Sequence, residues 1–255
     1  MTTALVTGPT SGIGRAFAQR LAADGHDLVL VSRDAERLHA LAAELAESGV
    51  LAEVLVADLA IAEQRVVVEQ RLADRGRPID VLVNNAGFSI NQKFVGGELA
   101  REQSLLDVMV VAVMRLTHAA VPGMSERGSG LIINISSVAG FLPFGTYSAA
   151  KSWVTFFTQG LATELAGTGV RTIAVCPGFV RTEFHSRAGV DMSMASERVW
   201  SSVDDVVDQA MKDLRRGRVL SVTGKQYKAL VAITHLLPRD VVRGLERHRR
   251  RRLGR

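Results

Sequence analysis

The chain has 255 residues, of which 31 are Lys or Arg and 26 are Asp or Glu, giving a formal net charge of +5. Hydrophobic residues make up 47% and charged residues 22%, a composition that excludes a disordered or low-complexity protein. A single cysteine, Cys176, excludes a disulfide framework, and six histidines without metal-ligand spacing predict that there is no catalytic metal.

The positive charge is concentrated at the C-terminal end. Residues 243–255 contain seven Arg and one Glu, a net charge of +6, which leaves −1 for the rest of the chain. This nearly neutral body gives no support to nucleic-acid binding. We therefore expect residues 241–255 to be a basic, solvated and disordered tail, with contact to an anionic membrane surface as the alternative.

Short apolar runs alternate with longer segments of helical periodicity along most of the chain. The runs are largely β-branched and bounded by turn residues, as buried parallel strands are. The alternation predicts a single α/β domain over residues 1–240, a Rossmann-like doubly wound parallel sheet with helices on both faces. The expected strands are 4–6, 28–31, 54–56, 81–83, 131–135 and 173–175.

Four longer segments are the clearest helix predictions. Residues 34–47 carry leucines at helical spacing, and residues 99–124, 148–165 and 227–237 complete the set. No run of about 18 apolar residues occurs, so we expect no membrane span. The N-terminal residues do not form a basic region followed by an apolar stretch, so we expect no signal peptide. The expectation is a soluble, cytoplasmic protein whose ligand site lies beyond the carboxyl ends of its strands.

A glycine-rich turn follows the first expected strand. Residues 7–14 read TGPTSGIG and lead directly into a helical segment. Glycines let the backbone turn tightly and approach a pyrophosphate, and a helix N-terminus offers it free N–H groups and partial positive charge. The G-x-x-x-G-x-G spacing at this position favours nucleotide binding over an ordinary glycine-rich turn.

Further motifs follow the later strands. The sequence NNAG at residues 84–87 ends the fourth strand, and a serine pair at 136–137 ends the fifth. The spacing Y-x-x-x-K at 147–151 begins a helix, and PGFVRT at 177–182 ends the sixth strand. With the glycine turn, they resemble the short-chain dehydrogenase/reductase family over about residues 3–225. The resemblance implies a nicotinamide-dependent oxidoreductase acting on a small carbonyl or alcohol substrate, and a homodimer or homotetramer.

The residues after the second expected strand indicate which nicotinamide cofactor is used. In dinucleotide folds an acid there binds the ribose 2′-hydroxyl, whereas an arginine accommodates a 2′-phosphate. If the strand ends at residue 31, Ser32 takes the acid's position, and Arg33 offers a charged fork to a phosphate. We therefore expect NADP(H), with NAD(H) less favoured. The alternative makes Arg33 a solvated helix residue and Asp34 the ribose acid.

The resemblance assigns cofactor contacts to residues of every motif. Asp58 resembles the family residue beside the adenine, although it could instead cap the next helix. The complete expected set is Gly8, Thr10, Ser11, Gly12, Ile13, Gly14, Ser32, Arg33, Asp58, Leu59, Asn85, Ala86, Gly87, Tyr147, Lys151, Pro177, Gly178, Val180 and Thr182.

Tyr147 and Lys151 are four residues apart and share one face of the expected helix. A phenol has a pKa of about 10, and a nearby ammonium is expected to lower it. By resemblance, Ser137, Tyr147 and Lys151 are catalytic: Ser137 holds the substrate oxygen, Tyr147 is the general acid or base, and Lys151 also binds the nicotinamide ribose. Ser136 is the alternative hydroxyl, and the second serine of the pair is favoured.

Two features depart from the family pattern. Ten positions separate Ser137 from Tyr147, a shorter loop than the family usually has. Met109 stands where the family generally has an Asn that holds a proton-relaying water, which a thioether cannot do. We hypothesise a functional enzyme with an altered relay. The alternative is a non-catalytic or weakly active NADP(H)-binding homologue that acts as a regulator or interaction protein.

Large apolar residues lie where the family covers its substrate. They favour a hydrophobic ketone or alcohol, although the same residues could simply pack the domain. The expected substrate contacts are Phe141, Phe144, Phe179 and Phe184, with Met192, Met194 and Trp200 further along the same segment. Cys176, between an apolar residue and Pro177, is expected to be a buried small residue rather than a nucleophile.

Overall fold

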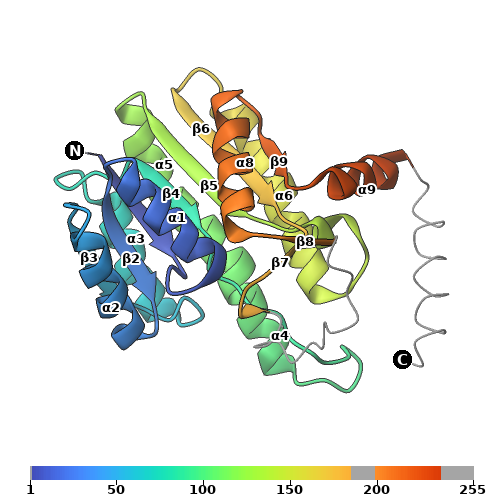
Figure 1. The fold of residues 1–255 in the computed structure, drawn as a ribbon. Coiled ribbons are helices and arrows are strands. Elements are labelled where there is room, and N and C mark those ends of the chain that lie inside the picture. The colour runs from blue at the N-terminus through green and yellow to red at the C-terminus, as the bar shows by residue number, and fades with distance from the viewer. Residues whose placement is uncertain (1, 185–198, 237–255) are drawn as a thin grey trace.

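The structure, a computed structural model, describes residues 2–184 and 199–236. Figure 1 shows a central sheet with helices packed on both of its faces. Met192, Met194 and the basic tail at 241–255 lie outside the described residues.

Seven parallel strands form the sheet in the order β3-β2-β1-β4-β5-β6-β9. All six predicted strands are confirmed. The sequence analysis missed β9, an edge strand of three residues that is too short to show a periodic pattern. The strands are β1 (Thr3–Thr7), β2 (Asp27–Ser32), β3 (Ala52–Val56), β4 (Val81–Asn84), β5 (Gly130–Ile135), β6 (Val170–Cys176) and β9 (Leu220–Val222).

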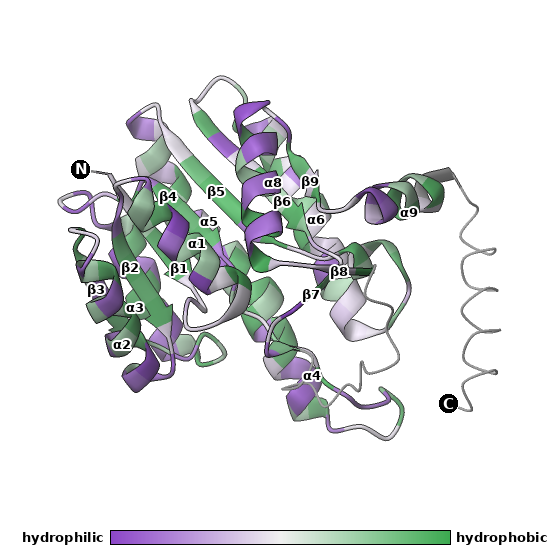
Figure 2. Ribbon diagram, viewed as in Figure 1, coloured by the Kyte–Doolittle hydropathy of each residue, from purple (hydrophilic) through white to green (hydrophobic). Residues whose placement is uncertain are grey.

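The sheet separates two apolar cores. On one face α1, α2 and α8 pack against the strands, with Phe17 and Leu38 completely buried. On the other face α3, α5 and α6 do so, and Figure 2 shows hydrophobic strands between helices with hydrophilic outer residues. The predicted doubly wound fold is confirmed. These helices are α1 (Gly12–Ala23), α2 (Ala35–Ala46), α3 (Ala62–Ala73), α5 (Ala112–Glu126), α6 (Thr146–Glu164) and α8 (Val203–Arg215), followed by α9 (Lys225–Leu236).

The longest predicted helix is interrupted by a wider turn. α4 (Leu99–Leu106) continues through a π-helical turn (Asp107–Val111) into α5. By length and composition alone this helix of 28 residues is apolar enough to cross a membrane. Its inner face belongs to the core, where Leu116 is completely buried between the sheet and α3.

The strand order reverses between β1 and β4. In open α/β sheets, ligands bind outside the carboxyl ends of the strands at such a switch point. The motifs at residues 7–14, 84–87, 136–137 and 177–182 all follow carboxyl ends of strands. The fold therefore brings motifs that are far apart in the chain to one edge of the sheet.

Candidate active site

The glycine turn connects β1 to the first turn of α1. Gly8 and Gly12 have φ angles of +63° and +55°, in the left-handed region that favours glycine. A Cβ atom at Gly14 would come within 2.2 Å of the Gly8 carbonyl oxygen, so the turn leaves no room for one. Ser11, the N-cap of α1, makes no side-chain cap hydrogen bond, which leaves the first helix amides for an anion. The turn fits the pyrophosphate of a dinucleotide.

The turn after β4 is hydrogen-bonded to the glycine turn. The Asn85 Nδ2 donates to the carbonyl oxygens of Thr7 and Gly8, both at 2.9 Å. The Thr7 Oγ1 accepts from the backbone amides of Asn85 at 2.9 Å and Ala86 at 3.0 Å. These four bonds hold two of the predicted cofactor motifs side by side at the switch point.

The carboxyl end of β2 places Ser32 and Arg33 at the edge of the sheet. The Arg33 side chain is 77% exposed, and its guanidinium lies 3.7 Å from the Asp58 carboxylate after β3. Asp34 is the N-cap of α2, and its Oδ1 accepts from the Arg37 amide at 3.1 Å. The alternative assignment of Asp34 as the ribose acid therefore competes with a helix cap, whereas the Arg33 guanidinium is accessible to a phosphate.

Asp58 and Leu59 form the turn before α3. The Asp58 Oδ1 accepts from the Ala60 amide at 2.9 Å, and the N-cap of α3 is Ile61, so the alternative role of Asp58 as that cap is wrong. The Leu59 side chain is buried in the core, and its carbonyl oxygen accepts a hydrogen bond from Arg65 at 2.8 Å. A cofactor contact at Leu59 would therefore involve its backbone amide.

Tyr147 and Lys151 lie in the first turns of α6, as their spacing predicts. The helix begins at Thr146, directly after Gly145, whose φ is +90°. The Lys151 Nζ lies 5.9 Å from the centre of the Tyr147 ring and donates to the Ile135 carbonyl oxygen of β5 at 2.7 Å. This bond fixes the ammonium between the sheet and the phenol.

The two serines after β5 have different surroundings. The Ser136 Oγ donates to the Lys151 carbonyl oxygen at 2.7 Å and lies 2.7 Å from the Thr155 Oγ1. Its hydrogen bonds are therefore internal to the fold. The Ser137 Oγ accepts from the Ala139 amide at 3.1 Å and donates to the Pro177 carbonyl oxygen at 3.5 Å, and the same hydroxyl acts on the phenol, where it lowers the pKa of Tyr147. The structure thus brings Ser137, the serine favoured by the resemblance, to the phenol.

Burial determines the protonation states in the site. It raises the pKa of Tyr147 to about 12, and the hydrogen bond with Ser137 only partly opposes this shift. Burial also lowers the pKa of Lys151 to about 8, against an opposing effect of Cys176. The expectation of a lowered phenol pKa is wrong for this site, because burial has the largest effect on Tyr147 and the opposing effect of Ser137 is smaller. The phenol is protonated at neutral pH and suited to donate a proton.

Cys176 is completely buried at the end of β6. Burial raises the pKa of its thiol to about 11, so the nucleophilic thiolate is not populated at neutral pH. The prediction of a buried small residue at this position is confirmed.

Met109 lies in the π-helical turn and borders the same site. It is 1% exposed. A Cβ atom placed on Gly87 would lie 3.7 Å from both the Met109 Sδ and the Lys151 Nζ, so the thioether and the ammonium adjoin one small space. The helix therefore widens next to the lysine, as π-helical turns often do at functional sites, but it presents an apolar side chain there.

A buried polar network behind the site was not predicted. The Asn84 Nδ2 donates to the Thr117 Oγ1 at 3.1 Å and the Asn134 Oδ1 at 2.8 Å, and the Asn134 Nδ2 donates to the Thr158 Oγ1 at 2.9 Å. These bonds tie β4 and β5 to α5 and to α6, the helix that carries Tyr147. The sequence feature that could have indicated this network is one asparagine in each of two otherwise apolar strands, β4 and β5.

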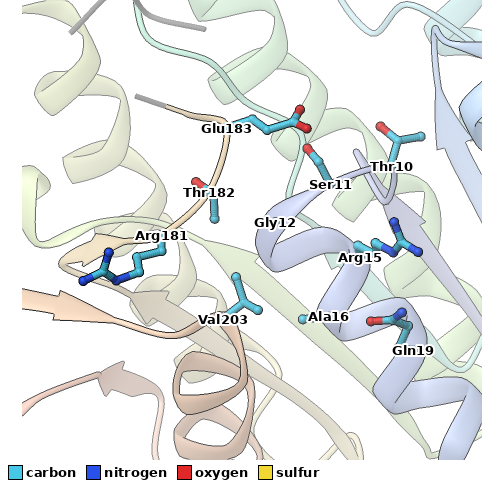
Figure 3. A pocket seen from close by; sticks show the side chains of 10 residues that line it. All are labelled: Thr10, Ser11, Gly12, Arg15, Ala16, Gln19, Arg181, Thr182, Glu183 and Val203. Atoms are coloured by element: carbon cyan, nitrogen blue, oxygen red, sulfur yellow. The ribbon is translucent and has the colours of Figure 1, made fainter. Parts of the chain in front are cut away.

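The motif after β6 continues into a short strand that approaches the glycine turn. β7 (Phe179–Val180) pairs in parallel with β8 (Trp200–Ser201). A Cβ atom at Gly12 would come within 2.9 Å of the Thr182 Cγ2, so Thr182 packs directly on the glycine turn. A pocket of about 280 Å³ lies between this segment and α1. Figure 3 shows its lining, with Thr10, Ser11 and Gly12 on one side and Arg181, Thr182 and Glu183 on the other.

The four predicted substrate residues have different surroundings. The Phe184 ring contacts the Tyr147 ring, with centroids 5.8 Å apart at an angle of 53°. Phe179 is 39% exposed on β7, Phe141 packs on the apolar cluster beside α9, and Phe144 is half-buried before α6. Phe184 is therefore the residue of this set that the structure places against the phenol.

Known proteins share both this fold and these motifs. The short chain dehydrogenase family matches residues 2–192. Ketoacyl reductase HetN of Nostoc sp. is 34% identical over 94% of this chain and 87% of its own length. A short-chain dehydrogenase from Sphingobium yanoikuyae, solved in complex with NADPH, is 39% identical with a TM-score of 0.84, over 92% of this chain and 94% of that one. A bulky-bulky ketone specific alcohol dehydrogenase from Comamonas testosteroni is 32% identical with a TM-score of 0.80, over 92% of each chain.

The chain belongs to the short chain dehydrogenase family, whose members are oxidoreductases. The resemblance that the motifs indicated is thereby confirmed for most of the described residues.

Proposed function

We propose that the protein is an NADP(H)-dependent oxidoreductase that interconverts a hydrophobic ketone and a secondary alcohol. The observation that carries the proposal is the arrangement of Ser137, Tyr147 and Lys151 beside the glycine turn at the carboxyl edge of the sheet. The NADPH complex of the Sphingobium relative and the ketone specificity of the Comamonas relative support it.

The cofactor would span the switch point, with its pyrophosphate at the glycine turn and the N-terminus of α1. Ser32 and Arg33 would hold the 2′-phosphate, Asp58 would lie beside the adenine, and Lys151 would bind the nicotinamide ribose. When bound, the reduced nicotinamide supplies a hydride. The remaining proposed contacts are Ile13, Leu59, Asn85, Ala86, Gly87, Tyr147, Pro177, Gly178, Val180 and Thr182.

The chain's own side chains bind the substrate oxygen and move the proton. Ser137 donates a hydrogen bond to the carbonyl oxygen and orients it toward Tyr147. The Tyr147 phenol gives its proton to that oxygen as the carbonyl is reduced, and takes one from the alcohol in the opposite direction. The Lys151 ammonium stabilises the phenolate that remains after proton donation. The Phe184 ring lies against the Tyr147 ring, where it would shield the phenol from water.

The first experiment is a titration of the purified protein with NADPH and NADH, followed by NADPH oxidation against a panel of hydrophobic ketones. We expect preferential binding of NADPH and turnover that depends on Tyr147. Binding of neither cofactor would overturn the proposal.

Ketone reduction should lose activity as the pH rises through about 8. The reaction needs a protonated Tyr147, whose pKa of about 12 keeps it protonated, and a charged Lys151, whose lowered pKa of about 8 makes it the group that titrates. Below this pKa the ammonium is present and kcat/KM is constant; above it the charge is lost and kcat/KM falls. The measurement is kcat/KM for a ketone from pH 6 to pH 10. A profile that is flat over this range would contradict the role of Lys151.

A second candidate function, a weakly active NADP(H)-binding homologue, is favoured by Met109 beside Lys151. Under the leading proposal we expect Met109→Asn to raise kcat about tenfold, because an amide restores a polar proton-transfer path beside the lysine. The measurement is kcat at saturating NADPH and ketone. An unchanged kcat would show that the relay does not limit turnover, and tight NADPH binding without turnover in either protein would favour the second candidate.

We also propose that the protein is a homo-oligomer. Large apolar side chains are exposed on α5 and α6, with Met114 44% and Phe156 62% exposed. An apolar surface of this kind is typical of an interface between subunits. Sedimentation velocity of the full-length chain measures the state directly, and a monomer at micromolar concentration would contradict the proposal.

A further inference from the structure

The second tyrosine of the chain, Tyr227, lies at the base of the segment that reaches the active site. It is on α9 and is 6% exposed. Its Oη donates to the Val199 carbonyl oxygen at 2.7 Å and accepts from the Phe179 amide at 3.1 Å. One hydroxyl therefore joins the first residue of β7 to the residue directly before β8.

The Tyr227 ring is held as closely as its hydroxyl. A Cβ atom at Gly178 would come within 2.0 Å of the Tyr227 Cε2, so the ring packs directly on the backbone before β7. Val138, Cys176 and Val222 belong to the same buried cluster. Packing fixes the ring, and with one hydrogen bond donated and one accepted the hydroxyl is satisfied.

The segment 179–184 connects the residues held by Tyr227 to the glycine turn and to Tyr147. Thr182 packs on Gly12 of the glycine turn. The Phe184 amide donates to the Thr182 Oγ1 at 3.2 Å, and the Phe184 ring contacts Tyr147. A continuous series of contacts therefore runs from α9 to the cofactor turn and to the phenol.

We propose that Tyr227 is a positioning residue for substrate binding, because its hydroxyl joins Phe179 to Val199 and thereby sets where Phe184 lies against Tyr147. This inference rests on the proposed function as a ketone reductase. Tyr227 does not touch the reacting atoms and acts through the segment 179–184. Without its hydroxyl, the Phe179 amide and the Val199 carbonyl oxygen each lose a hydrogen-bond partner, which favours a displaced segment.

The test is Tyr227→Phe, which keeps the ring on Gly178 and removes only the Oη. Thr234→Val is the matched control, since the Thr234 Oγ1 donates to the Val231 carbonyl oxygen of its own helix at 2.8 Å. We expect Tyr227→Phe to raise KM for the ketone about tenfold with kcat within about twofold, and Thr234→Val to change neither. A general loss of folded protein would instead lower the apparent kcat and leave KM unchanged, and that result would overturn the role.

Amide hydrogen exchange provides a readout that does not depend on the ketone. The Phe179 amide should exchange about tenfold faster in Tyr227→Phe than in the wild-type protein and at the wild-type rate in Thr234→Val. Unchanged exchange at Phe179 would overturn the role of Tyr227. Absence of ketone turnover in the wild-type protein, with faster exchange at Phe179 in the variant, would instead count against the proposed function alone.

Discussion

Exchanging Tyr147 for phenylalanine is expected to lower kcat for ketone reduction about a thousandfold, the contribution typical of a positioned general acid. The variant removes the one atom that would donate the proton under the proposed mechanism, and it keeps the ring that packs on Phe184. Burial raises the pKa of Tyr147 to about 12, so the phenol carries its proton throughout the neutral range and no second protonation state complicates the comparison.

Ser148 offers a matched control on the next residue of α6. Its hydroxyl is buried and makes no hydrogen bond to the part of the chain that the structure describes. Ser148→Ala should therefore leave kcat and KM within about twofold of the wild-type values, since no partner is lost. NADPH affinity should also remain within about threefold in Tyr147→Phe, because Tyr147 supplies at most one of many cofactor contacts. A Tyr147→Phe variant that keeps more than about a tenth of the wild-type kcat would contradict the general-acid role.

Replacing Arg33 by alanine is expected to raise the Kd of NADPH about 10- to 100-fold and to leave the Kd of NADH nearly unchanged. A hydrogen bond between charged groups contributes about 1.5–3 kcal/mol, and only NADPH carries the 2′-phosphate that Arg33 would bind. The Arg33 side chain is 77% exposed and 3.7 Å from Asp58, so its loss removes one weak ion pair from the folded protein and little stability.

Arg37→Ala is the control that distinguishes a direct contact of Arg33 with the 2′-phosphate from a general effect of lost positive charge. Arg37 lies in the first turn of α2, the helix that follows Arg33, and it pairs with Asp34 and Glu183. Its removal changes the net charge by the same amount, yet the Kd of NADPH should change by less than about threefold, because exposed charges are screened by salt. Isothermal titration of both variants with both cofactors measures the difference. Equal losses in the two variants, or an equal loss for NADPH and NADH in Arg33→Ala, would contradict the assignment of the 2′-phosphate site.

The fold class, the order of six strands along the chain and the order of the motifs could all be predicted from the sequence. These features depend on local properties: apolar runs of strand length, glycines that permit left-handed backbone at Gly8 and Gly12, and a spacing of four that places Tyr147 and Lys151 on one helix face. Each can be predicted because residues close in the chain are enough to produce it. The edge strand β9 escaped prediction because its pairing depends on β6, far from it in the sequence.

Three features of the site depend on tertiary packing: which serine acts on the phenol, in which direction the pKa of Tyr147 shifts, and which side chain borders the space beside Lys151. Ser136 is hydrogen-bonded internally with Thr155, and burial has a larger effect on the Tyr147 phenol than Ser137 does. Met109, from another helix, borders the same space beside Gly87 as the Lys151 ammonium. The role of Tyr227 has the same origin, because its hydroxyl bonds to residues 48 and 28 positions away. Burial and contacts of this kind are set by the elements that pack around a residue, and the residues next to it in the chain do not specify them.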